Sequence, residues 1–162
     1  RLVFATAPEG KPRSLIEEQF LAHGINGDRL SFHGMLSNME FRQLLQKVDV
    51  TLDPVTVNGA TSTCESLWLG VPVISLVGTR FLSRAGFSIL SAAGMPEFAL
   101  HSVSDCIGLA RHIADDLSGL SRLRASMRDR ISNSPLTNGA LFASNIEQAY
   151  RTIWTRWCNT PV

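Results

Sequence analysis

The sequence lacks the features that mark several large classes of protein. It has no apolar run near the about 20 residues of a membrane-spanning helix, and its first ten residues do not have the shape of a signal peptide. It also has no cluster of basic residues, and its formal net charge is only +1. Binding to nucleic acid or to a membrane surface through a basic patch is therefore not expected.

Cysteine is scarce and histidine is scattered. The three cysteines are widely spaced without a C-x-x-C motif, and no two of the four histidines stand at the spacing of an H-x-x-x-H metal site. Neither a disulfide framework nor a metal centre is indicated. We expect reduced cysteines, a cytoplasmic protein and no metal.

Three well-known catalytic or nucleotide-binding motifs are also missing. The chain has no G-x-G-x-x-G, no Walker lysine and no G-x-S-x-G elbow. Its 162 residues are 44% hydrophobic, which is enough for the core of one domain. Because the sequence does not begin with Met, we expect residues 1–162 to be a single, partial domain of a longer chain.

What the chain does contain is a regular alternation of short apolar segments and helical patterns. Strands are expected at residues 2–5, 30–33, 48–52, 71–76 and 98–100. Helices are expected between them at residues 12–22, 64–69 and 82–93, and a further helix is expected to begin after a capping residue at Asn38. Three amphipathic helices follow, the last of which carries Phe142 and Trp157. This order predicts an α/β fold, a Rossmann-like doubly wound parallel sheet with a helical C-terminal extension.

The turn between the third strand and its helix is the strongest candidate for a binding site. It reads Asn58-Gly59-Ala60-Thr61-Ser62-Thr63 and leaves the carboxyl edge of the sheet, where ligands bind in this fold class. Unpaired N–H groups and the dipole at the helix start stabilise an anion, and the hydroxyls add donors. A phosphate site is one interpretation. The other is a capping box, Ser62-x-x-Glu65, that binds nothing.

Three other residues lie at the same expected edge. Asp53 ends a strand and either faces a ligand or turns the chain through an Asx-turn, while Arg84 either faces phosphate or is solvated. His33 follows a strand in the same way. On the last helix, Trp154 and Trp157 share a face, which favours packing against a partner domain over stacking on a ligand.

Four segments carry a resemblance to a known family. They are Val48-Asp49-Val50-Thr51-Leu52-Asp53; Asn58 through Pro72; Gly78 followed by Ser83-Arg84 and Ser88-Ile89-Leu90; and Ser134-Pro135-Leu136. Together they resemble the C-terminal catalytic lobe of the O-linked N-acetylglucosamine transferase and SPINDLY family, the TPR-linked glycosyltransferases of family 41. The resemblance implies the C-terminal half of a GT-B fold.

The same resemblance implies a substrate and site residues. The lobe would hold the nucleotide half of UDP-N-acetylglucosamine, with Thr61 and Ser62 on the diphosphate and Glu65 accepting hydrogen bonds from the ribose. It would transfer the sugar to Ser or Thr of a protein acceptor. The full set of expected site residues is Asn58, Gly59, Thr61, Ser62, Thr63 and Glu65, with Leu36 and Arg84 as additional candidates.

The chain departs from the family pattern at three positions. Phe41 stands where a His is usual, Ala60 where a Thr or His is usual, and Asn38 where a Lys is usual. Each loss is expected to lower affinity by about 1–3 kcal/mol where its former partner stays buried and unpaired. These departures leave open a non-catalytic interaction module, or an enzyme with another donor such as GDP-fucose or UDP-glucose.

The resemblance also implies parts that lie outside this sequence. The acceptor-side N-terminal lobe, the TPR repeats and the catalytic residues are expected elsewhere in the parent chain, so the isolated chain is expected to be inactive. An unrelated α/β phosphate-binding enzyme, such as a sugar-phosphate isomerase, would leave the four matching segments unexplained.

Overall fold

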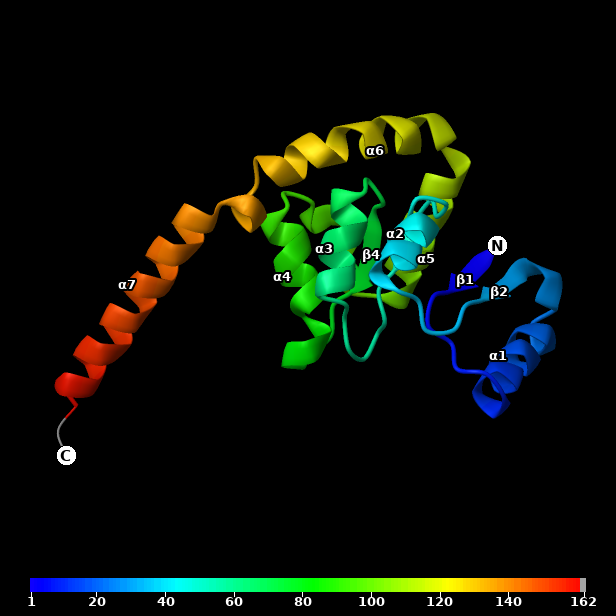
Figure 1. The fold of residues 1–162 in the computed structure, drawn as a ribbon, viewed down its shortest axis with the longest axis horizontal. Helices are drawn as coiled ribbons and strands as arrows, with labels where there is room; N and C mark the ends of the chain where they lie inside the picture. Colours follow the sequence, from blue (N-terminus) through cyan, green and yellow to red (C-terminus); the bar gives the residue numbers. More distant parts are fainter. Residues whose placement is uncertain (161–162) are drawn as a thin grey trace. The chain divides into compact units, whose positions relative to one another are not determined.

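The computed structural model describes residues 1–160, which form two compact units (Figure 1). The first unit is Arg1–Val48, and the second begins at Asp49 and contains the rest of the described residues. Each has its own small parallel sheet, so the strand and helix alternation read from the sequence is present in both.

The first unit is built around two strands and two helices. Strands β1 (Leu2–Phe4) and β2 (Leu30–Phe32) pair in parallel, and the chain between them forms α1 (Lys11–Ala22) and the 3-10 turn η1 (Gly27–Arg29). Phe4 stacks on Phe32 with ring centroids 4.9 Å apart and meets Phe20 of α1 edge-on at 6.1 Å. These rings hold α1 against the two strands.

Helix α2 (Asn38–Leu45) begins one residue earlier than the sequence suggested. Ser37, rather than Asn38, is the capping residue, because Ser37 has an extended backbone while Asn38 is already helical. The Ser37 hydroxyl accepts from the Glu40 N–H at 3.3 Å, and the Glu40 carboxylate accepts from the Ser37 N–H at 2.8 Å. These two bonds form a capping box, whereas the sequence predicted only a simple cap one residue further on, at Asn38.

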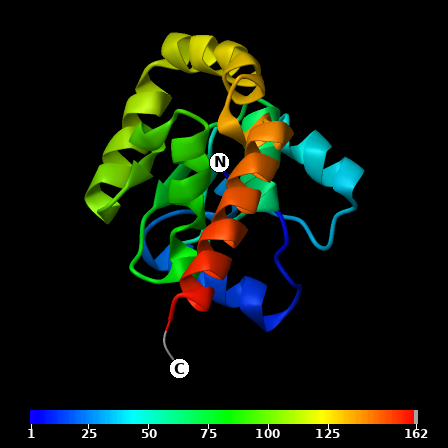
Figure 2. The same ribbon diagram turned by 90° about the vertical axis from the view of Figure 1, so that its left-hand side faces the viewer.

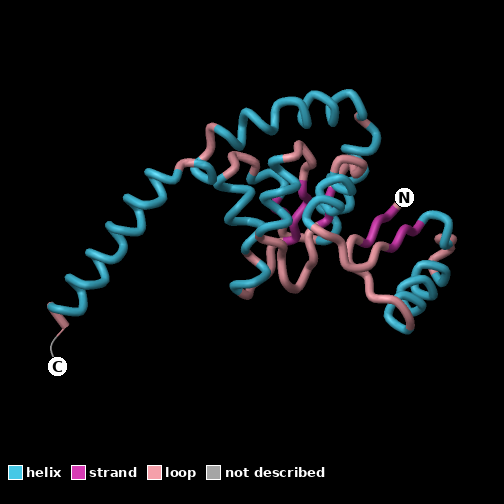
Figure 3. The backbone as a smooth tube through the Cα atoms, viewed as in Figure 1, coloured by secondary structure: helices cyan, strands magenta, loops and turns pink. Residues whose placement is uncertain are grey.

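The second unit has a three-stranded parallel sheet in the order β3-β4-β5 (Figure 3). The strands are β3 (Thr51–Leu52), β4 (Val73–Leu76) and β5 (Ala99–Leu100), connected by α3 (Thr61–Trp68) and by α4 (Ala85–Ala92). Figure 1 shows α3 and α4 on one side of β4 and α5 (Val103–Asp115) on the other. Consecutive parallel strands joined by right-handed helical crossovers give this arrangement.

The core of the second unit lies between the sheet and these helices. Helix α6 (Leu117–Ser132) packs against α3 and α5 and covers this core. The side chains of Leu67, Val73, Leu90, Met95 and Met127 have no measurable exposure. Burying a large aliphatic side chain of this kind contributes about 1.5–3 kcal/mol each, so this cluster is the main apolar support of the sheet.

Several predicted strands and helices are longer than the observed ones. The strand expected at 48–52 begins only at Thr51, because the Val48 N–H still donates to the Leu45 carbonyl in the turn that ends α2. The strand at 71–76 begins at Val73, and the helix at 82–93 is a 3-10 turn η2 (Phe81–Ser83) followed by α4. Two further 3-10 turns are η3 (Pro96–Phe98) and η4 (Pro135–Thr137).

The last helix, α7 (Gly139–Cys158), has no buried residue. Figures 1 and 2 show it as one continuous helix that follows η4. Its exposed large apolar side chains are Leu141, Phe142, Ile146, Tyr150, Ile153, Trp154 and Trp157. The two tryptophans are 67% and 74% exposed, so nothing in residues 1–160 packs over them.

None of the helices between residues 1 and 160 combines the length and the apolar character that crossing a membrane would require.

Three glycines end helices in the left-handed conformation, and two of them, Gly70 and Gly94, predict a measurable difference in stability. Gly70 follows α3 at φ 75° and Gly94 follows α4 at φ 70°. A Cβ at Gly70 would lie 3.0 Å from the Arg124 carbonyl oxygen of α6, whereas a Cβ at Gly94 would meet nothing within 4 Å. We expect Gly94→Ala to cost about 1–2 kcal/mol of unfolding free energy from backbone strain alone, and Gly70→Ala to cost more. Chemical denaturation measures both, and equal losses would contradict the close approach of α3 and α6.

The cap of α6 predicts a pH effect. The N–H of Gly119 and the hydroxyl of Ser118 both donate to Asp116 at 2.8 Å and hold the pKa of its carboxyl below the ordinary 3.8. The folded chain therefore binds this proton less tightly than the unfolded chain does, so Asp116 stabilises the fold above pH 3.8 and the effect fades as pH falls through the lower folded pKa. In denaturation from pH 7 to pH 2, the advantage over Asp116→Asn should shrink with acid. An advantage independent of pH would contradict this.

Candidate functional site

The candidate site is the loop that leaves β3 and enters α3. It begins at Asp53, at the carboxyl end of β3, and reaches the first turn of α3 at Thr61. Asp53 still belongs to the sheet, because its N–H donates to the Ile74 carbonyl of β4 at 2.9 Å. The loop thus starts from a fixed point at the edge where parallel α/β sheets bind ligands.

The start of α3 has no side-chain cap. The residue before the helix is Ala60, and no side chain accepts a hydrogen bond from the first-turn N–H groups. The capping box Ser62-x-x-Glu65 was therefore a wrong interpretation: the helix begins at Thr61, so Ser62 is its second residue and lies inside the first turn. The positive end of the helix is left open to an external anion.

Hydroxyl groups surround this helix start. Thr61 and Ser62 are exposed, whereas Thr63 is 2% exposed. A Cβ at Gly59 would lie 2.6 Å from the Ser62 hydroxyl oxygen and 2.8 Å from that of Thr63, so only glycine fits between them. The turn therefore brings two hydroxyls within contact of its own backbone and presents Thr61 and Ser62 to solvent.

Asn58 and Gly59 are used inside the protein. The Asn58 side chain, 7% exposed, donates to the Pro54 carbonyl at 2.9 Å and accepts from the Gly86 N–H at 3.3 Å. The Gly59 N–H donates to the Asp53 carboxylate at 2.6 Å. Both predicted site residues thus make hydrogen bonds inside the protein that fix the shape of the turn.

Asp53 lies at the centre of this arrangement and is 8% exposed. One carboxylate oxygen accepts from Gly59, and the other accepts from the Ser75 hydroxyl of β4 at 2.7 Å. Burial raises the pKa of the Asp53 carboxyl above its ordinary value, and the hydrogen bonds from Gly59 and Ser75 oppose that shift. Neither bond is that of an Asx-turn, in which the carboxylate accepts from the N–H two residues further along the chain; the partners of Asp53 are Gly59 in the turn and Ser75 of β4.

The other predicted residues lie at different places. Glu65 is half-buried on α3, one turn after Thr61, and Arg84 is exposed just before α4. Leu36 and His33 are half-buried in the first unit, where the His33 backbone pairs with Phe4 and Ala7. Glu65 and Arg84 thus share the second unit with the turn, while Leu36 does not.

Sequence reasoning missed two residues of the arrangement, Ser75 and Gly86. Ser75 is fully buried in β4, and a Cβ at Gly86 would lie 2.5 Å from the second Asp53 oxygen. A signal for Ser75 was present, because it is the one hydroxyl in the apolar stretch of residues 71–77. No local pattern marked Gly86, since its neighbour Asp53 is far away in the sequence.

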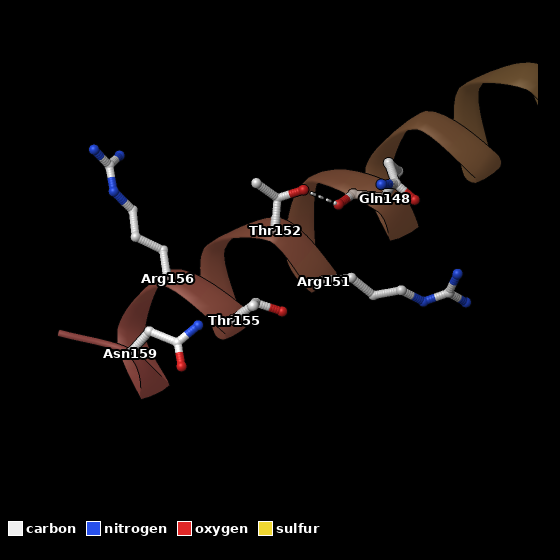
Figure 4. A pocket seen from close by; sticks show the side chains of 6 residues that line it. All are labelled: Gln148, Arg151, Thr152, Thr155, Arg156 and Asn159. Carbon is white, nitrogen blue, oxygen red and sulfur yellow. Dashed lines mark hydrogen bonds between the residues drawn. The ribbon is translucent and has the colours of Figure 1, made fainter.

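Two other features of the described chain bear on ligand binding, its metal-ligating side chains and a hollow along α7. Within residues 1–160, no group of three or more His, Cys, Asp or Glu side chains could hold a metal ion. An open hollow of about 520 Å³ lies along α7, but all of its lining residues come from that helix. Figure 4 shows the Arg151 and Arg156 side chains extending to opposite sides, so they do not gather around a common ligand.

Comparison with known proteins places the chain in a family. The model of glycosyl transferase family 41 matches residues 3–146. A probable UDP-N-acetylglucosamine–peptide N-acetylglucosaminyltransferase SPINDLY of Petunia hybrida is 35% identical over 128 residues, which are 79% of this chain and 14% of that protein. The SPINDLY protein of Solanum lycopersicum is 36% identical over the same shares.

A solved structure agrees with these relatives. A K341M mutant of the Thermobaculum terrenum O-GlcNAc transferase matches 93% of this chain and 29% of its own, with a TM-score of 0.84 and 29% identity. The expected α/β, Rossmann-like fold of a GT-B C-terminal half is thereby confirmed. The chain spans about one seventh of the curated relatives' length. It belongs to glycosyl transferase family 41, as a segment of the O-GlcNAc transferase and SPINDLY type.

Proposed function

We propose that residues 1–162 are the nucleotide-sugar-binding part of a protein O-GlcNAc transferase-like enzyme. The parent would transfer N-acetylglucosamine from UDP-N-acetylglucosamine to Ser or Thr of a protein acceptor. The family model spans both units, which supports treating them as one partial domain. The observation that carries the proposal is the uncapped start of α3 with its exposed Thr61 and Ser62 hydroxyls.

The chemistry of this helix start suits a diphosphate leaving group. When the glycosidic bond to the nucleotide breaks, negative charge grows on the diphosphate oxygen. Backbone N–H groups and hydroxyls that are already in place stabilise that charge without rearranging. Thr61 and Ser62 would donate to the diphosphate, and Glu65, one turn further along α3, would accept hydrogen bonds from the ribose hydroxyls. In this proposal the charge is stabilised without a metal ion.

The remaining parts of the enzyme would come from the rest of the parent chain. The acceptor-side lobe and TPR repeats would supply the catalytic residues and the protein-binding surface. The exposed apolar side chains of α7, among them Trp154 and Trp157, are consistent with a helix that is covered by another part of the parent. The three cysteines are unpaired, which agrees with a cytoplasmic protein.

Two residues favour a second function, Ala60 in the turn and Phe41 in α2. Ala60 precedes α3 and supplies no polar side chain there, and Phe41 lies half-buried in α2. Both occupy positions where the family usually has a polar residue. They favour a changed donor, such as GDP-fucose or UDP-glucose, or a lobe that binds a partner instead of a nucleotide.

Titration of UDP and GDP into the full-length parent by calorimetry tests the proposal. We expect UDP to bind, and Glu65→Ala to weaken binding by about 10-fold or more, because hydrogen bonds from the ribose hydroxyls to a carboxylate are lost. Preference for GDP would change the donor class. Failure of a folded parent to bind either nucleotide would contradict the transferase function and favour the interaction module.

The hydroxyl of Ser62 provides a second test with a matched control. Ser62 and Ser104 are both exposed and both are the second residue of a helix, α3 and α5 respectively. We expect Ser62→Ala to weaken UDP binding by about 10-fold or more, the effect of one lost hydrogen bond to a charged group, and Ser104→Ala to leave it unchanged. Equal affinities of the two variants would argue against phosphate contact at Ser62.

A further inference from the structure

The buried carboxylate of Asp53 has no role in the function proposed so far. It is 8% exposed, so it is not a surface group, and both of its oxygens already accept hydrogen bonds from within the protein. A buried acid whose pKa is raised by desolvation costs stability in its charged form unless its bonds offset that cost. The two hydrogen bonds that oppose this cost come from the turn and from β4.

The bonds of Asp53 connect the sheet to the turn. Its own N–H donates to Ile74 of β4, and its side chain accepts from the Ser75 hydroxyl of the same strand at 2.7 Å. The remaining oxygen accepts from the Gly59 N–H at 2.6 Å. Because Asp53 is fixed to β4 by both backbone and side chain, the Gly59 bond fixes the turn to the sheet.

The start of α4 is part of the same arrangement. A Cβ at Gly86 would lie 2.5 Å from one Asp53 oxygen and closer still to the Ser75 hydroxyl oxygen, so α4 approaches the carboxylate as closely as a glycine permits. Asn58 joins the turn to α4 through the Gly86 N–H at 3.3 Å. The turn thus lies in a polar cluster formed by β3, β4 and the start of α4.

The position of Gly59 decides where the hydroxyls lie. A Cβ at Gly59 would lie 2.6 Å from the Ser62 hydroxyl and 2.8 Å from the Thr63 hydroxyl, so these groups rest against the Gly59 backbone. A shift of Gly59 therefore moves the first turn of α3. When only a fraction of a protein holds its binding conformation, its apparent affinity falls by that fraction.

We propose that Asp53 is a positioning residue, which holds the turn from Asn58 to Thr63 in its phosphate-binding conformation through Gly59 and Ser75. The inference rests on the proposed function, because it assumes that this turn binds the diphosphate. Asp53 does not touch the nucleotide in this proposal. It acts through the Gly59 backbone.

The test compares Asp53→Ala with a chemically matched variant in the full-length parent. Asp116 also accepts from one glycine N–H and one serine hydroxyl, but it caps α6. UDP affinity is measured by calorimetry at a temperature where thermal unfolding shows every variant to be folded. Asp53→Ala should weaken UDP binding by about 10-fold or more, whereas Asp116→Ala should bind UDP as the unaltered parent does.

A conservative variant separates positioning from a general loss of stability. In Asp53→Asn, the amide oxygen can still accept from Gly59, and the amide NH2 can donate to the Ser75 hydroxyl. Its UDP affinity should return most of the way to that of the unaltered parent. If Asp53→Ala and Asp116→Ala bind UDP with equal affinity, the inference is overturned. It is also overturned if Asp53→Asn recovers none of the UDP affinity that Asp53→Ala loses.

A further pair of variants decides the matter if Asp53→Ala does not fold. Ser75→Ala removes only the bond to the second oxygen, and Ser134→Ala removes a comparably buried hydroxyl that donates to the Ile131 carbonyl at 2.7 Å. Weaker UDP binding by Ser75→Ala than by Ser134→Ala supports the inference, and equal binding overturns it. Absence of nucleotide binding by the unaltered, folded parent would overturn the proposed function as well.

Discussion

The bond between the Asp53 carboxylate and the Gly59 N–H is the constraint on which the candidate site depends. It is 2.6 Å long and joins the end of β3 to the turn before α3. Ser75 fixes the other carboxylate oxygen to β4. Since charge-assisted hydrogen bonds are about twice as strong as neutral ones, this pair of bonds sets the path of the chain over the next several residues.

The site therefore has two layers with different properties. The inner layer is buried and is made of Asp53, Asn58 and Ser75. The Ser75 hydroxyl donates to the Asp53 carboxylate, and the Asn58 side chain donates to the backbone carbonyl of Pro54. The outer layer is exposed and consists of Thr61 and Ser62 on the first turn of α3. Groups that must stabilise a growing charge act best when a rigid shell holds them, because they then need no rearrangement during the reaction. In family 41 chains of this type, the inner layer deserves as much mutational study as the outer one.

The sequence allowed much of the fold to be predicted, because hydrophobic periodicity is a local property. The alternation of strands and helices and the parallel sheets were confirmed, as was the family resemblance. Boundaries were less accurate: Val48 remains in the turn after α2, and Ser37 instead of Asn38 caps that helix. The Ser62-x-x-Glu65 box has the right residue types but begins inside the helix, and only the backbone conformation of Ala60 and Thr61 decides that.

The sequence by itself determined that a glycine and three hydroxyls stand between a buried strand and a helix, because this is a matter of residue order. Which of those residues are exposed and which bond inside the protein was decided by the tertiary structure. Asn58 and Gly59 are turned to internal partners, Gly86 and Asp53, which are 28 and 6 residues away along the chain. Gly86 and Ser75 reach Asp53 only when β4 pairs with β3 and α4 packs behind the loop. Contacts between distant residues depend on packing, and no local pattern encodes them.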